Sequence, residues 1–127
     1  MRYMILLTYD EKQAVPPDER LINEMGMFNA RLEKAGVLRA GEGLVASDHG
    51  ARVTVTDDKR TVVDGPFAES KEQFAGYYLI DVADLDAALE WAKKVPLGDG
   101  SIEVRPVAMM PDETGTPQVV GAEQAGA

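Results

Sequence analysis

The segment Asp64-Gly-Pro-Phe-Ala-Glu-Ser-Lys-Glu72 gathers the side chains of this sequence that are best suited to acid–base chemistry. Its Gly-Pro pair allows a sharp, rigid turn, which would hold Asp64, Glu69 and Lys71 at the mouth of a cavity. A carboxylate removed from water has a raised pKa and can act as a general base, so Asp64 and Glu69 are candidate catalytic residues. Lys71 would hold an anionic ligand. The alternative is a rigid connector with no chemical role.

Four other side chains are weaker candidates for ligand binding. Arg39 and Glu42 flank a bend made by two glycines, where the backbone allows close approach. The hydroxyl groups of Tyr9 and Tyr77 could line a cavity. The alternative for Arg39 and Glu42 is an ion pair on the surface or between subunits, and for the two tyrosines it is packing.

The composition excludes several kinds of site. The 127 residues include no Cys and one His, so a disulfide framework, a thiolate zinc site, a Cys nucleophile and a multi-histidine metal site are excluded within one chain. The single histidine, His49, lies in a polar loop and is expected to be solvated. Asp57 and Asp58 lack a third ligand, and we expect neither a metal nor a cofactor. The formal charge of −9 argues against nucleic acid or an anionic membrane as a partner.

The two ends of the chain set the expected domain limits. The apolar run after Met1 is short and is soon interrupted by acid, unlike a signal sequence or a membrane span, so a cytoplasmic protein is expected. Residues 111–127 are rich in Gly, Ala, Pro and Gln. This composition predicts a flexible acidic C-terminal tail after a single domain over residues 1–110.

Apolar periodicity predicts the elements that position these side chains. Strands are expected over residues 2–8, 37–44, 76–82 and 101–107, and a hairpin with strands over 52–56 and 60–63. Apolar spacings of three and four predict a helix over 21–35 that Gly36 ends, and a second helix that Asp84 caps. Ser70-Lys-Glu-Gln73 has capping-box spacing and could start a single helical turn. Gly26 would cost the first helix about 1 kcal/mol relative to Ala unless close packing needs it.

The order of these elements is that of an α+β fold, a ferredoxin-like split βαβ unit with an inserted β-hairpin. The strands over 2–8 and 76–82 are apolar on both alternating sets of side chains, so we expect them in the sheet centre, covered on both faces. Right-handed crossovers put both helices on one face, which leaves the other face apolar and uncovered. We therefore expect a homodimer in which two sheets stack.

The segment 64–72 and the strand Gly76-Tyr-Tyr-Leu-Ile-Asp-Val82 resemble the signature of the DGPF branch of the YciI-related (YCII) domain family. The resemblance covers about residues 1–108 and includes Ala35-Gly-Val-Leu, Gly41-Glu-Gly-Leu and Ile102-Glu-Val-Arg-Pro-Val107. It implies a dimeric α+β barrel and an activity that is undefined for most members. Members of this branch are often encoded beside extracytoplasmic-function sigma factors, which implies a functional link of that kind.

Some members of the wider family are proposed or known to act on small organic acids through a His-Asp pair, with the His in the first helix. Phe28 or Asn29 stands at that position here, so this mechanism does not carry over. Two functions stay open. The favoured one is a domain that binds a small polar ligand or acts as an accessory in a sigma-factor-linked regulatory system. The other is a lyase or isomerase that acts on a small organic acid by carboxylate acid–base chemistry.

Overall fold

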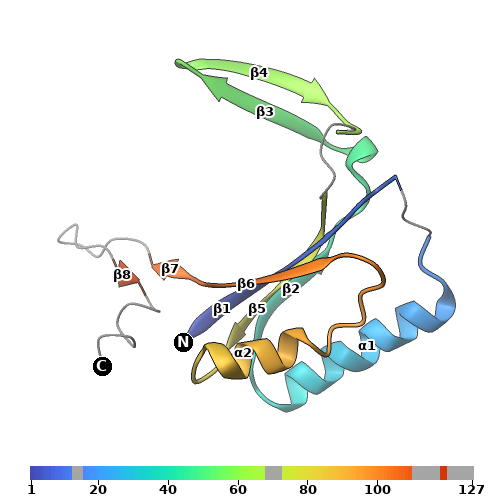
Figure 1. Cartoon of the computed structure of the whole chain (residues 1–127), viewed down its shortest axis with the longest axis vertical. Coiled ribbons are helices and arrows are strands. Elements are labelled where there is room, and N and C mark those ends of the chain that lie inside the picture. Colours follow the sequence, from blue (N-terminus) through green and yellow to red (C-terminus); the bar gives the residue numbers. More distant parts are fainter. Residues whose placement is uncertain (13–15, 68–72, 110–117, 120–127) are drawn as a thin grey trace.

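The computed structural model describes residues 1–12, 16–67, 73–109 and 118–119. Its main sheet is antiparallel, in the order β2-β5-β1-β6. The strands are β1 (Arg2–Tyr9), β2 (Leu38–Gly43), β5 (Gln73–Asp81) and β6 (Ser101–Pro106). Two helices, α1 (Glu19–Lys34) and α2 (Leu85–Ala92), lie on one face of this sheet (Figure 1). The α+β class, the order of elements and the central position of β1 and β5 are confirmed.

The inserted hairpin stands apart from the main sheet. Its strands, β3 (Ala51–Thr56) and β4 (Lys59–Asp64), follow a short 3-10 turn, η1 (Ser47–His49). They form a separate sheet that leaves one end of the main sheet and arches on the side opposite the helices (Figure 1). We call this hairpin the arm.

A short pairing near the C-terminus completes the described structure. Strand β7 (Ala108–Met109) pairs with β8 (Gln118–Val119). Apart from β8, the predicted tail over residues 111–127 lies outside the described residues.

The core lies between the sheet and the helices. Its buried apolar side chains are Tyr3, Ile5, Leu7, Phe28, Leu32, Tyr78, Ile80, Ala88, Ala92 and Val95. In β1 and β5 they occupy alternate positions, as expected for side chains that point to one face of a sheet. Phe28 makes edge-to-face contacts with the rings of Tyr78 and Trp91, at centroid distances of 5.4 and 6.2 Å.

The helix ends follow the local sequence. Helix α1 begins two residues before the predicted start at Leu21. The side chain of Asp18 caps it by accepting a hydrogen bond from the backbone N–H of Leu21 at 2.8 Å. Gly36 has a φ of 74° and ends the helix as predicted. Asp84 caps α2 by accepting from the N–H of Ala87 at 2.9 Å, also as predicted. A Cβ added at Gly26 would meet nothing within 4 Å, so close packing does not require this glycine.

Strand β5 begins three residues before the predicted start. Gln73 is its first residue, and this residue is 8% exposed. The predicted helical turn over 70–73 is therefore wrong at Gln73, because this residue pairs with Tyr9 of β1. Residues 70–72 lie outside the described residues.

The face opposite the helices is half-buried in the single chain. Its centre consists of two cross-strand pairs of β1 and β5, Met4 with Leu79 and Leu6 with Tyr77. We call these four residues the open face. We predicted that β1 and β5 are covered on both faces. Within one chain, the helices cover one face of these strands, and the open face is only half-buried.

Candidate functional site

The structure separates the residues that the sequence singled out. Glu42 of β2 and Tyr77 of β5 are direct cross-strand partners and lie together at the open face. Arg39 lies elsewhere on β2, where its Nη2 is 3.6 Å from Oδ2 of Asp81. Within the chain, the expected ion pair of Arg39 with Glu42 is wrong. Leu38 pairs with Ile80 across the two strands, so the next residues, Arg39 and Asp81, lie close together. The Asp81 carboxylate is therefore the acid that the Arg39 side chain can reach.

Two of the remaining candidates, Tyr9 and Asp64, belong to the end of the main sheet where the arm begins. Tyr9 is the last residue of β1 and Asp64 is the last residue of β4. Asp64 is exposed, so the burial that a general base would need is absent from its described surroundings. Glu69 and Lys71 lie outside the described residues.

A carboxylate joins three distant segments at this end of the sheet. Oε1 of Glu11 accepts a hydrogen bond from the backbone N–H of Ser47, and Oε2 accepts one from the Ser47 hydroxyl, both at 2.6 Å. The Ser47 hydroxyl in turn accepts from the N–H of Phe67 at 3.3 Å. The end of β1, the turn η1 and the segment 64–67 are therefore held as one unit.

The segment 64–67 is anchored by further contacts. The N–H of Gly65 donates to the carbonyl of Gly50 at 2.9 Å, and the guanidinium of Arg52 lies 3.9 Å from the centroid of the Phe67 ring. The buried amide of Gln73 donates to the Phe67 carbonyl at 3.2 Å. A cis peptide bond joins Gly65 to Pro66. The described part of the segment therefore has the contacts that a rigid connector needs.

Gly65 is required for a reason that differs from the predicted one. Glycine often allows a sharp turn by adopting a positive φ, but Gly36 is the one glycine with positive φ in the described part of the chain. A Cβ at Gly65 would instead collide with the backbone carbonyl of Ser47. The glycine is needed because two backbone segments meet there.

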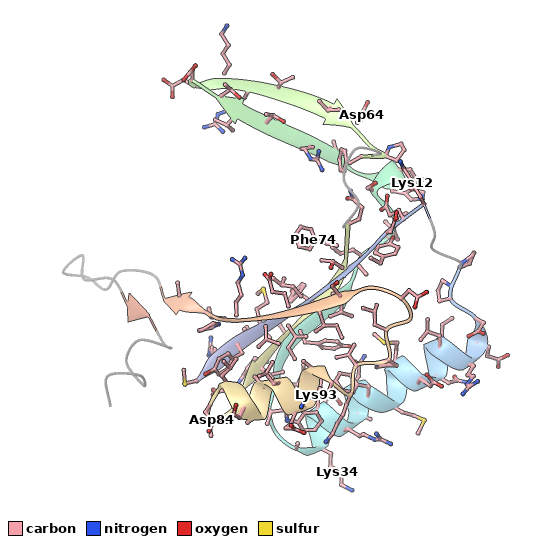
Figure 2. The ribbon with its side chains drawn as sticks, in the orientation of Figure 1. Lys12, Lys34, Asp64, Phe74, Asp84 and Lys93 are labelled. Carbon is pink, nitrogen blue, oxygen red and sulfur yellow. The ribbon has the colours of Figure 1, made fainter. Side chains whose placement is uncertain are left out.

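These contacts border a pocket of about 310 Å³, which we call the root pocket. Its lining residues are Asp10, Glu11, Lys12, Ala46, Asp48, Pro66 and Phe67. Lys12 and Asp64 lie at this end of the molecule (Figure 2). Because Ser47 occupies both oxygens of Glu11, the charges that can meet a ligand are the carboxylates of Asp10 and Asp48 and the ammonium of Lys12. Pro66 and Phe67 add an apolar wall.

Tyr9 lies beside this network as a neutral phenol. Burial raises its pKa, and the charge of Glu11 and a side-chain hydrogen bond with Glu11 raise it further. A phenol with a raised pKa keeps its proton at neutral pH and can act as a hydrogen-bond donor. Tyr9 is therefore suited to positioning a group and unsuited to abstracting a proton.

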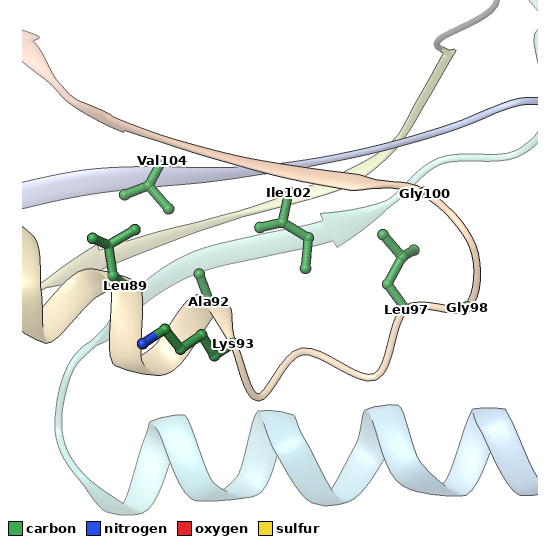
Figure 3. A pocket seen from close by; sticks show the side chains of 8 residues that line it. All are labelled: Leu89, Ala92, Lys93, Leu97, Gly98, Gly100, Ile102 and Val104. Carbon is green, nitrogen blue, oxygen red and sulfur yellow. The ribbon is translucent and has the colours of Figure 1, made fainter.

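A second hollow of about 270 Å³ lies between α2 and β6 (Figure 3). Its lining residues are Leu89, Ala92, Lys93, Leu97, Gly98, Gly100, Ile102 and Val104. The ammonium of Lys93 is 3.2 Å from a carboxylate oxygen of Glu90, and the other lining side chains are aliphatic. This hollow therefore lacks converging polar groups and extends the core.

Sequence reasoning found Tyr9 but missed its neighbours Asp10, Glu11 and Lys12, as well as Ser47 and Asp48 of η1. The available signal was a run of charged residues directly after a central strand. Such a run lies at the end of the sheet, where loops from other strands meet and where ligand sites are often found.

Two further properties concern the described residues as a whole. In the ranges that the structure describes, no group of three or more His, Cys, Asp or Glu side chains is placed to hold a metal ion. Across the same ranges, no helix is long and apolar enough to cross a membrane.

The four-stranded antiparallel sheet with two helices on one face and an inserted hairpin defines a small α+β domain with split βαβ connectivity. The YCII-related domain matches residues 1–111, and the chain belongs to this family. The chain is also similar to the uncharacterized protein R00369 of Rhizobium meliloti (strain 1021). The two are 36% identical over 116 residues, which cover 86% of this chain and 94% of that protein. The family predicted from the sequence is thus confirmed at the level of the YCII-related domain.

Proposed function

We propose that this YCII-related protein is a non-catalytic homodimer of the DGPF branch that binds a small zwitterion, such as an amino acid, in the root pocket. The observation that carries this proposal is the way Glu11 and Ser47 fix the pocket walls. Small-molecule sites are usually preformed pockets in which a small number of placed polar groups orient the ligand.

The charges of the root pocket favour this class of ligand. Asp10 and Asp48 suit an ammonium group, and Lys12 suits a carboxylate. The wall formed by Pro66 and Phe67 suits an apolar side chain. A volume of about 310 Å³ is near the lower limit for ligand pockets, so the ligand is small.

Binding is favoured over lyase or isomerase chemistry because of how the acidic groups are used. The Glu11 carboxylate is committed to Ser47, Tyr9 keeps its proton, and Asp64 is exposed. Glu11, Tyr9 and Asp64 are thus engaged, neutral and solvated, respectively, and Asp10 and Asp48 are left to pair with the ammonium group of the ligand.

The open face supports the homodimer. Met4, Leu6, Tyr77 and Leu79 form an apolar centre, and the charged residues of β2 and β6 flank it. An apolar centre with a polar rim is the usual pattern of a protein interface. Two sheets that stack about this face would form a dimeric α+β barrel. Sedimentation equilibrium at micromolar concentration tests this assembly, and a mass equal to one chain contradicts it.

Calorimetric titration with L-leucine tests the ligand site. The matched probes are 4-methylpentanoate, which lacks the ammonium group, and 3-methylbutylamine, which lacks the carboxylate. We expect leucine to bind more tightly than either analogue. Asp48→Asn should weaken leucine binding by about tenfold, the loss of one charge-assisted hydrogen bond, and should leave binding of the acid analogue unchanged.

Asp58→Asn, at the tip of the arm, is the matched control for this titration and should bind leucine like the native protein. Equal binding of leucine to the Asp48 and Asp58 variants would place the ligand elsewhere. No heat of binding from any of the three probes at millimolar concentration would contradict the zwitterion site.

A further inference from the structure

The arm has an apolar face that the described part of its own chain leaves in water. Val53 pairs with Val62 across the two strands, and Val55 lies on the same face. Their exposed fractions are 56%, 66% and 54%, respectively. We call these three residues the valine face. The opposite face carries the pair Thr54 and Thr61.

An isolated two-stranded hairpin in water is marginally stable at best. In the described residues, β3 and β4 pair with each other and with no third strand. The valine face therefore needs an apolar partner surface that the rest of the described chain does not provide.

The arm leaves the domain in a fixed direction. Its base is held by the hydrogen bond from Gly65 to Gly50, by the close contact of Gly65 with Ser47 and by the stacking of Arg52 on Phe67. The arm is thus presented rigidly on the side of the main sheet that the open face occupies (Figure 1).

Phe74 is an exposed aromatic residue near the start of β5, on the side of the main sheet where the arm lies. It is 60% exposed, and in Figure 2 it projects from the start of β5 toward the side where the arm lies. A second copy that covers the open face would approach from the side where Phe74 and the arm lie. The open face, Phe74 and the arm thus lie on the same side of the molecule, opposite the helices.

The charge of the arm also suits contact with a second copy of this chain. Within residues 51–64, Arg52, Lys59 and Arg60 balance three aspartates, whereas the whole chain carries a charge of −9. Two copies of an acidic chain repel each other least where they meet through a neutral segment.

We propose that the valine face of each arm packs on the second copy of the chain, so that two arms clasp the dimer reciprocally. This inference rests on the proposed homodimer and names a contact beyond the open face. In a two-fold dimer, both arms make the same contact, and each adds apolar area to the stacked sheets.

Dimer dissociation measured by sedimentation velocity tests the contact. Val62→Asp places a charge on the valine face, and Thr61→Asp places the same charge on the opposite face at the neighbouring position. We expect Val62→Asp to raise the dimer dissociation constant at least about tenfold and Thr61→Asp to change it less than about threefold. Equal effects, or no effect of Val62→Asp, would overturn the arm contact while leaving the dimer.

Amide hydrogen exchange of the native protein gives an independent readout. Exchange over residues 51–64 should slow as protein concentration rises through the dissociation constant, because the partner stabilises the arm. Protection that persists in the dilute monomer would assign the valine face to another part of the same chain and overturn the proposal. A native protein that is monomeric at every concentration would overturn the dimer together with the arm contact.

Discussion

Gly65 lies against the backbone carbonyl of Ser47 so closely that no Cβ fits between them. The contact joins the base of the arm to the turn that lines the root pocket. A side chain at position 65 would push the two backbone segments apart and would displace Pro66 and Phe67, which line the root pocket.

Gly65→Ala should therefore destabilise the protein by about 1–3 kcal/mol, the usual cost of forcing an extra methyl group into a packed region. Thermal unfolding measures this loss. Gly43→Ala is the matched control, since a Cβ there would meet nothing within 4 Å. Equal stability of the two variants would show that the backbone at Gly65 moves aside without cost.

Gly26 offers the opposite case. It lies inside α1 with open space around it, so Gly26→Ala should raise the free energy of unfolding by about 1 kcal/mol. Gly36→Ala should lower it by about 1–2 kcal/mol, because Gly36 has a φ of 74° and a Cβ is strained there. Urea denaturation of both variants checks the two signs. A loss of stability for Gly26→Ala would point to a contact on that side of α1 in the assembled protein.

The carboxylate of Asp81 predicts a dependence of stability on pH. Its pKa is lowered, chiefly by a hydrogen bond from the N-terminal ammonium at 2.9 Å and further by the charges of that ammonium and of Arg39. A pKa that is lower in the folded state stabilises the fold above the unfolded value, and this stabilisation disappears as the pH falls through the folded value.

Asp81→Asn should consequently be less stable than the native protein at about pH 7, and the difference should shrink as the pH falls below about 4. Unfolding curves at several pH values measure it, with Asp99→Asn, an exposed loop variant, as the control. A difference that stays constant down to about pH 2 would contradict the role of the Asp81 charge.

Tyr78 and Asn29 are expected to be coupled. The hydroxyl of Tyr78 donates to Oδ1 of Asn29 at 2.6 Å, and burial raises the pKa of Tyr78, which keeps the donor proton in place. Tyr78→Phe and Asn29→Ala should each cost about 1 kcal/mol, and the double variant should cost less than their sum. A double-mutant cycle in urea measures the coupling, and strict additivity would show that the bond contributes nothing.

The sequence predicted the scaffold better than the site. The central position of β1 and β5 could be predicted because both alternating sets of their side chains are apolar, and Gly36 and Asp84 marked helix ends through local backbone chemistry. Glu11 and Ser47 are 36 residues apart, and each looks like a solvated polar residue in its own neighbourhood. Their pairing depends on where the arm returns to the sheet, which no local pattern records. Arg39 was misjudged for the same reason, since its partner Asp81 lies on another strand.

Among the residues that the structure describes, the arm is joined to the domain at its base alone, so its length can change without disturbing the core. Side chains alternate along a strand, and adding one residue to each strand would turn Val53 and Val62 to the other face, whereas adding two would keep them in place. Insertions and deletions in this hairpin should therefore be tolerated in relatives when each strand changes by an even number of residues. Arm length can then vary between species as an independent character, while the β2-β5-β1-β6 sheet stays the same.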